Sequence, residues 1–195
     1  MNIYFIKELL DQYFKIEHFF PDQPFSTIFP ETYKKLNINK YIYPDFLITF
    51  HGMMIQNSNN VDKIFTTVFL GDEILNEVFN RLERDVLIIS HHPLHMETSG
   101  RGFLPISKNF FKKMKKFGVS IYVIHTPLDA HNDISTWRAM SNKLELSIIK
   151  KYCSEAIGFS CVCGLYKHMI LFEELLLKIS EITGVKDLHF IKKKK

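Results

Sequence analysis

The sequence predicts an α/β fold, a layered sheet built from parallel βαβ units with flanking helices. From residue 61 onward, apolar β-branched runs alternate with amphipathic stretches of helical length. Two of the runs, VLIIS at 86–90 and VSIYVI at 119–124, lack regular polar alternation, which is typical of strands covered on both faces. We expect a single α/β domain over residues 1–195 that ends in a lysine tail at 192–195.

The elements are predicted in order along the chain. Apolar residues at helical spacing predict a helix over 3–15, and four prolines predict a loop-rich stretch over 16–48. Asp72 is suited to cap the start of one later helix and Gly118 to end another. Strands are predicted at 64–70, 86–90, 119–124, 157–162 and 187–191, and helices at 73–83, 108–117, 134–144 and 171–183.

The composition narrows the class of protein. The chain has 195 residues, of which 46% are hydrophobic and 24% charged, and this excludes intrinsic disorder and a polytopic membrane protein. A net charge of +4 is small for a nucleic-acid-binding protein. Three cysteines form no secreted-type framework, and Lys7 and Glu8 come too early for a secretory signal peptide. We expect a cytoplasmic protein that contacts neither a membrane nor nucleic acid.

Histidine-rich turns follow the two apolar strands. One turn is HHPLH at 91–95 and the other is HTPLD at 125–129. Carboxyl ends of neighbouring parallel strands meet at one edge of a sheet, where ligands gather. His91 and His92 point in different directions if the strand continues through them, and they can serve different metals if a turn begins there. A lone histidine at a strand end is usually structural, but two such turns favour a metal site.

Two other clusters favour structural roles. Cys161 and Cys163 lie in an apolar run without a second cysteine pair, so a buried strand is favoured over a metal knuckle. The lysines at 112–116 are typical of a solvated helix face. The sequence contains neither a glycine-rich phosphate loop nor a serine nucleophile elbow.

The two histidine motifs resemble those of the Nif-three-like (NGG-one-interacting-factor-three-like) dinuclear metal-binding family. Members of this family are also labelled type-two GTP cyclohydrolase I homologues. DVLIISHHPL at 85–94 is similar to the family's strand-HHP motif, and GVSIYVIHTPLD at 118–129 to its strand-HTxLD motif. The resemblance covers about residues 1–191. It implies an α/β fold, two metal ions and a toroidal homohexamer whose sites face the interior.

The resemblance also implies roles for single residues. His91 and His92 would be metal ligands, and Asp129 a ligand that can bridge two ions. His125 would line the site as a ligand or as a hydrogen-bond donor to one. His125 and Glu97 are the candidate catalytic residues, as general bases. The implied cofactors are one or two divalent ions per chain, chosen among zinc, iron, manganese and nickel.

One family motif has no counterpart in this sequence. It is a C-terminal His-x-x-x-Glu that supplies the remaining ligands. Three interpretations stay open: the chain lacks the family's C-terminal part, the local residues His95, Glu97 and His131 substitute, or the site is a remnant.

The predicted function is metal binding with water activation, as in metal-dependent hydrolases of the cyclohydrolase type. The expected partners are a small, nucleotide-like substrate and further copies of the chain. The alternative is a catalytically degenerate binding or regulatory protein on the same fold.

Overall fold

The computed structural model describes residues 1–18, 38–96, 103–154 and 159–189. The chain divides into two compact units, a larger one built from Met1–Leu128 and a smaller one from the described residues that follow. The single domain expected over the whole chain stays a prediction. Within the described ranges, no helix is both long enough and apolar enough to cross a membrane.

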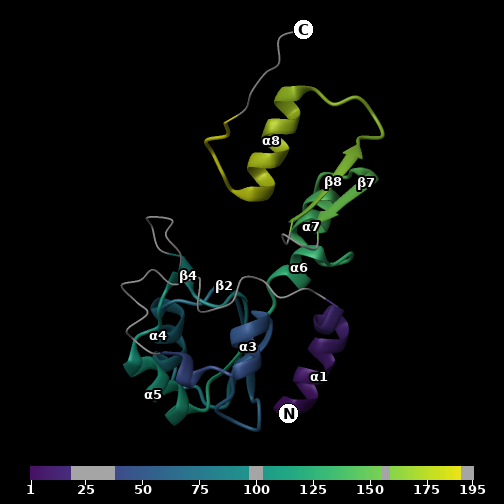
Figure 1. Ribbon diagram of the computed structural model, residues 1–195. Helices are drawn as coiled ribbons and strands as arrows, with labels where there is room; N and C mark the ends of the chain where they lie inside the picture. Colours follow the sequence, from purple (N-terminus) through teal and green to yellow (C-terminus); the bar gives the residue numbers. More distant parts are fainter. Residues whose placement is uncertain (19–37, 97–102, 155–158, 190–195) are drawn as a thin grey trace. The chain divides into compact units, whose positions relative to one another are not determined.

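A four-stranded sheet forms the centre of the first unit (Figure 1). Its strands, in the spatial order β1-β6-β3-β2, are β1 (Gly52–Ile55), β6 (Ser120–Val123), β3 (Val86–His92) and β2 (Lys63–Phe69). β2, β3 and β6 are parallel, whereas β1 runs antiparallel to β6. The connections between the parallel strands contain α4 (Asp72–Asn80) and α5 (Lys108–Phe117), so the predicted α/β fold with βαβ units is confirmed.

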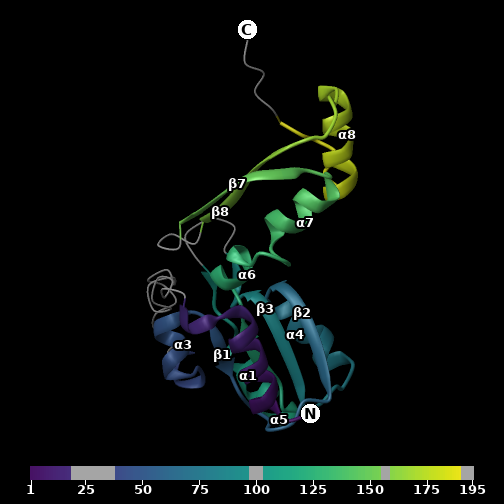
Figure 2. The same ribbon diagram turned by 90° about the vertical axis from the view of Figure 1, so that its right-hand side faces the viewer.

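Helices cover both faces of this sheet. They are α1 (Ile3–Phe14) on one face, and α3 (Pro44–Thr49), α4 and α5 on the other. Figure 2 shows α1 lying along its face. Ile88 of β3 packs into the core under α4 and α5, while its neighbour Leu87 packs against Ile3 of α1. Successive residues of a strand face opposite sides, so a strand covered on both sides is apolar throughout.

A buried phenol ties α1 to the sheet. Tyr122 of β6 is fully buried, and its hydroxyl donates a hydrogen bond to the carboxylate of Asp11 on α1. Asp11 also forms an ion pair with Lys7, one turn earlier on the same helix. Burial, and then the Asp11 carboxylate, raise the pKa of Tyr122 well above its ordinary value.

The second unit contains an antiparallel strand pair, β7 (Ser147–Ser154) and β8 (Phe159–Leu165). Helices α7 (Thr136–Lys143) and α8 (Phe172–Thr183) flank the pair along the chain. Trp137 of α7 is the chain's single tryptophan. The Arg138 guanidinium carbon lies 4.8 Å from its ring centroid and the Lys151 ammonium 4.9 Å. β8 confirms a strand around Cys163, but the cysteine is exposed, so the predicted burial is wrong.

Other differences from the predicted elements have local causes. The strand predicted over 187–191 is wrong for 187–189, where Asp187 and His189 are exposed and the backbone is not in a strand; residues 190 and 191 lie outside the described ranges. α4 is capped by the backbone of Gly71, and Asp72 is its first helical residue rather than its N-cap. β7 was not predicted because Lys150 interrupts its apolar pattern.

We expect Tyr122→Phe to lower the free energy of unfolding by about 1–3 kcal/mol at pH 7, because a buried hydrogen bond to a carboxylate is lost. The pH dependence should change as well. The fold keeps the phenol protonated while the unfolded chain ionises it near pH 10, so this stabilisation is complete below pH 10 and is lost as the pH rises above it. The wild type should lose about 1.4 kcal/mol per pH unit more than the variant does.

Urea unfolding between pH 8 and pH 11 measures both effects. Tyr13→Phe is the matched control, since Tyr13 is an exposed tyrosine of α1, the helix that carries Asp11. Equal slopes above pH 10 in the wild type and in Tyr122→Phe would show that the buried phenol does not set the pH dependence.

Candidate metal centre

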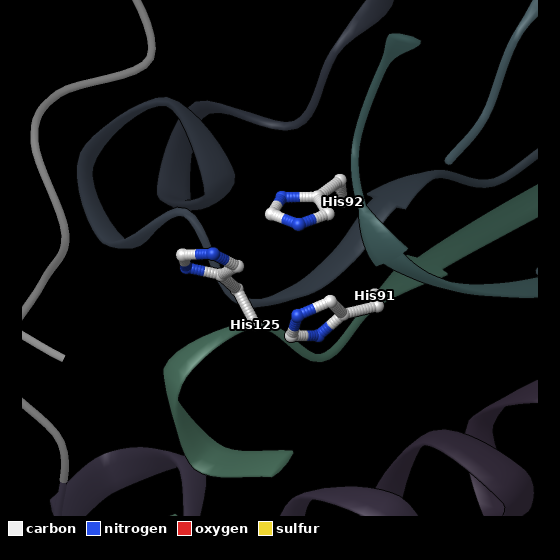
Figure 3. Close-up of side chains that lie close together, drawn as sticks. All are labelled: His91, His92 and His125. Atoms are coloured by element: carbon white, nitrogen blue, oxygen red, sulfur yellow. The ribbon is translucent and has the colours of Figure 1, made fainter. Parts of the chain in front are cut away.

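Three imidazole rings meet at the carboxyl ends of β3 and β6, which are neighbouring parallel strands. His91 and His92 are the last two residues of β3, and His125 follows the end of β6. One candidate ligand atom from each residue lies within 4.8 Å of the other two, and all three residues are half-buried (Figure 3). The structure thus brings together the two turns that the sequence singled out.

β3 continues through both of its histidines, and their rings still converge. The ring centroids of His91 and His92 are 4.4 Å apart. The ring centroid of His125 lies 5.0 Å from that of His91 and 4.7 Å from that of His92. In Figure 3 both rings extend to the side of β3 on which His125 lies. Of the two alternatives left open by the sequence, the strand therefore continues, but the side chains do not separate.

A backbone hydrogen bond fixes the ring of His91. Its Nδ1 lies 3.0 Å from the carbonyl oxygen of Ile124. A carbonyl only accepts hydrogen bonds, so Nδ1 carries the hydrogen and Nε2 of the neutral ring presents a lone pair. The amide of Ile124 in turn donates to the carbonyl of Ser90 at 2.9 Å, which extends the pairing of β3 with β6. Metal-binding histidines commonly donate their second N–H to such a carbonyl.

Phenylalanine rings surround the histidines. Phe69, the last residue of β2, stacks on His92 with the ring centroids 4.5 Å apart and the planes 6° from parallel. Phe50 meets His125 edge to face at 5.6 Å, and Phe103 lies 6.0 Å from His92. These contacts restrict the rotation of the imidazole rings. Sequence reasoning missed all three, although Phe69 lies within the strand predicted over 64–70, which pairs with the strand that carries His92.

The described group of candidate ligands consists of the three histidines alone, and the other predicted site residues are not part of it. Asp129 is half-buried in the short helix α6 (Thr126–Ala130), four residues after His125, and its role as a ligand stays a prediction. Glu97 lies outside the described residues. His95 is exposed, with its Nδ1 2.9 Å from the carbonyl of Met96, and His131 accepts a hydrogen bond from the amide of Asp133. Within the described part of the chain, no carboxylate or thiolate joins the histidine group.

The donor set fits a divalent ion. Three imidazoles are one of the ligand sets of catalytic zinc, and they leave a coordination position open for substrate or water. Iron, manganese and nickel also accept imidazole ligands. The half-buried setting and the anchored ring of His91 supply the orientation that such ligands need.

Comparisons with known proteins agree with this architecture. The family model described as Duf34/NIF3 (NGG1p interacting factor 3) matches residues 45–195. The fold is similar to the crystal structure of TTHA1606 from Thermus thermophilus, with a TM-score of 0.65 and 19% identity over 96% of this chain and 64% of that one. It is also similar to ybgI, a protein of unknown function, with a TM-score of 0.61 and 17% identity over 96% and 63% of the two chains.

A third similar structure is reduced HcgD from Methanocaldococcus jannaschii, with a TM-score of 0.51 and 16% identity over 78% of this chain and 60% of that one. No curated protein matches the sequence. The chain thus spans less than two thirds of the length of each of these structures, and at such identities they establish the fold alone. The family model matches most of the sequence, and it shows that the chain belongs to the Duf34/NIF3 family.

Proposed function

We propose that the chain binds a divalent metal ion through His91, His92 and His125 and acts as a metal-dependent hydrolase. The convergence of three ligand atoms within 4.8 Å carries the proposal. Membership of the Duf34/NIF3 family supports it, because the sequence resemblance links the same two motifs to metal binding. The proposed roles of Asp129 as a further ligand and of Glu97 as a general base rest on the sequence alone.

The chain's own groups position the reaction. A bound divalent ion supplies Lewis acidity and lowers the pKa of a coordinated water toward about 7. Ile124 orients His91 through its carbonyl, and Phe69 holds the plane of the His92 ring. Three imidazoles, when neutral, add no negative charge, so the charge of the ion is not compensated within the group and favours an anionic substrate. This supports a nucleotide-like substrate.

The second candidate function is a non-catalytic binding or regulatory protein. It is favoured by the absence, among the described residues, of a carboxylate within the histidine group. A hydrolase of this kind commonly pairs its metal ligands with a separate acid or base. Metal binding is common to both candidates, so turnover separates them.

Removal of one imidazole should release the metal. We expect about one ion per chain in the wild type, and less than about 0.2 in His92→Ala, because two ligands hold a divalent ion far more weakly than three. Elemental analysis of protein purified without chelator measures this. His168→Ala is the matched control, since His168 is exposed and belongs to the second unit. Metal-free wild-type protein after growth in zinc-supplemented medium would contradict the proposal.

Phe69→Leu should weaken metal binding without removing a ligand. Loss of the stacking contact with His92 should reduce the free energy of zinc binding by about 0.5–1.5 kcal/mol. This corresponds to a roughly two- to tenfold lower affinity for zinc. Competition titration with a chromophoric chelator measures the affinity. Phe65→Leu is the matched control. Phe65 is a half-buried phenylalanine of the same strand, and it packs against the hydrophobic core rather than on His92. Phe65→Leu should keep the wild-type affinity, and an equal loss in both variants would reduce the effect to general destabilisation.

Turnover distinguishes the two candidate functions. With GTP as the first substrate, we expect the wild type to consume GTP when zinc or manganese is present. Liquid chromatography measures the remaining GTP. His92→Ala should abolish the consumption, whereas Lys115→Ala on the exposed face of α5 should leave it unchanged. Fully metal-loaded wild type that consumes neither GTP nor a panel of other nucleotides would favour the non-catalytic candidate.

A further inference from the structure

Two cysteines of β8 place their thiols on one face of the strand pair β7–β8. Cys161 and Cys163 are alternate residues of the strand, so both side chains extend to the same side. We call this side the thiol face. Neither cysteine forms a disulfide; Cys163 is exposed and Cys161 is half-buried. Two thiols are therefore presented together to a ligand from solvent.

The opposite face of the strand pair is occupied by α7. Lys151 of β7 stands beside Val162 of β8, between the two cysteines. Its ammonium donates hydrogen bonds to the carbonyl of Ala130 and to the side chain of Asn132, both at 2.9 Å, and it lies 4.9 Å from the ring centroid of Trp137. The contacts with the rest of the second unit are thus made on the Val162 face, and the thiols are on the other.

A positive charge lies on the thiol face. Lys150 stands opposite Cys163 and Tyr152 stands opposite Cys161, and residues that pair directly share a face. The Lys150 ammonium lies 4.8 Å from the ring centroid of Tyr152, so it lies over the part of β7 that borders the thiols. β7 and β8 contain no acidic residue. The thiol face therefore favours a bound group that carries negative charge at its sulfurs.

The backbone that carries the thiols is held in place. The pairing of β7 with β8 is regular from Lys150–Cys163 to Ser154–Phe159. Directly after Cys163, the strands approach so closely that a Cβ at Gly164 would lie 2.9 Å from the Cβ of Leu146. Ligands on such a fixed backbone lose little conformational entropy when they close on an ion.

We propose that Cys161 and Cys163 bind one copper(I) ion between their sulfurs, with Lys150 balancing the charge. Thiolate is a soft ligand that selects Cu(I), zinc or iron–sulfur clusters. Zinc takes three or four protein ligands and iron–sulfur clusters take four, whereas the thiol face offers two sulfurs. Cu(I) is satisfied by two thiolates, so it is the ion that this pair fits.

The charges balance on binding. Each thiol releases its proton to water and donates a sulfur lone pair to the ion, which keeps its monovalent state. Two thiolates and one Cu(I) leave one net negative charge, and the Lys150 ammonium offsets it. A disulfide is a poorer use of the pair, because alternate Cα atoms of a strand are about 6.6 Å apart, near the upper end of the range of about 4.4–6.8 Å that disulfides span.

The thiol pair is independent of the histidine group. It belongs to the second unit and the three imidazoles belong to the first. The ligands also differ in kind, since imidazole suits divalent zinc, iron and nickel and thiolate suits Cu(I). The copper proposal therefore does not rest on the proposed hydrolase function.

Titration of the full chain with Cu(I), without oxygen, tests the site. We expect a sulfur-to-copper charge-transfer absorption that saturates at about one ion per chain, in the wild type and in His92→Ala alike. Cys163→Ser should abolish the absorption. It should also weaken binding by more than about 100-fold in competition with bathocuproine disulfonate, because loss of a direct ligand costs more than loss of an outer partner.

Cys153→Ser is the matched control for this titration. Cys153 pairs with Ser160 in the register and is not an alternate residue of the pair. This variant should keep the wild-type absorption and affinity. A wild type without the absorption, or an equal absorption in Cys163→Ser, would overturn the proposal, and so would displacement of the copper by a tenfold excess of zinc.

A second variant tests the common face with the number of thiols held constant. Cys161→Ser combined with Val162→Cys keeps two thiols but moves one of them to the face on which Lys151 lies. It should lose the absorption, as Cys163→Ser does, and unchanged binding would overturn the argument from one face. Cys163→Ser changes an exposed side chain, so the test stays decisive even where Val162→Cys disturbs the strand.

The role of Lys150 is tested through affinity. Lys150→Met should weaken Cu(I) binding roughly two- to fivefold, because an exposed ammonium contributes a modest Coulomb attraction. Lys167→Met removes an exposed charge outside the strand pair and should keep the wild-type affinity. Equal affinities of Lys150→Met and the wild type would overturn the charge balance assigned to Lys150.

Discussion

The parallel pairing of β3 with β6 determines where the side chains of His91, His92 and His125 meet. Ser90 stands beside Val123 at the end of the paired segment, and the amide of Ile124 extends the ladder by one more hydrogen bond. The carbonyl of the same Ile124 accepts from the His91 ring, and His125 is the next residue. A shift of one residue between the two strands would move every β6-derived group to the other face of the sheet and would separate the three imidazoles.

Much of this arrangement follows from the sequence, because its causes are local or general. VLIIS and VSIYVI are apolar because helices cover both faces of the sheet, and their carboxyl ends coincide because the strands are parallel. The contact of Phe50 with His125 could not be anticipated in this way. It depends on β1, whose four residues GMMI give little strand signal and which pairs antiparallel with β6. The strand prediction is wrong over 187–189 for the converse reason: an apolar pattern alone does not supply a pairing partner.

The two sides of α1 show how one helix serves two environments. Ile3 and Ile6 pack against the sheet, and the hydroxyl of Tyr122 on the sheet donates a hydrogen bond to Asp11 of the helix. One flank carries charged groups around a cavity and the other carries exposed apolar rings and methyl groups. A hydrophobic pattern alone identifies the buried stripe of such a helix, but the difference between its flanks becomes visible only once β1 and β2 are placed at opposite ends of the sheet.

The position of Trp137 has a consequence for spectroscopy. The only indole of the chain lies in the second unit, with the cationic groups of Arg138 and Lys151 within 4.9 Å of its ring centroid, while the three imidazoles lie in the first. Its emission is therefore a local reporter of the second unit. Zinc has a filled d shell and takes part in no redox chemistry. A change in tryptophan emission on addition of zinc would accordingly report a change in the surroundings of Trp137 within the second unit.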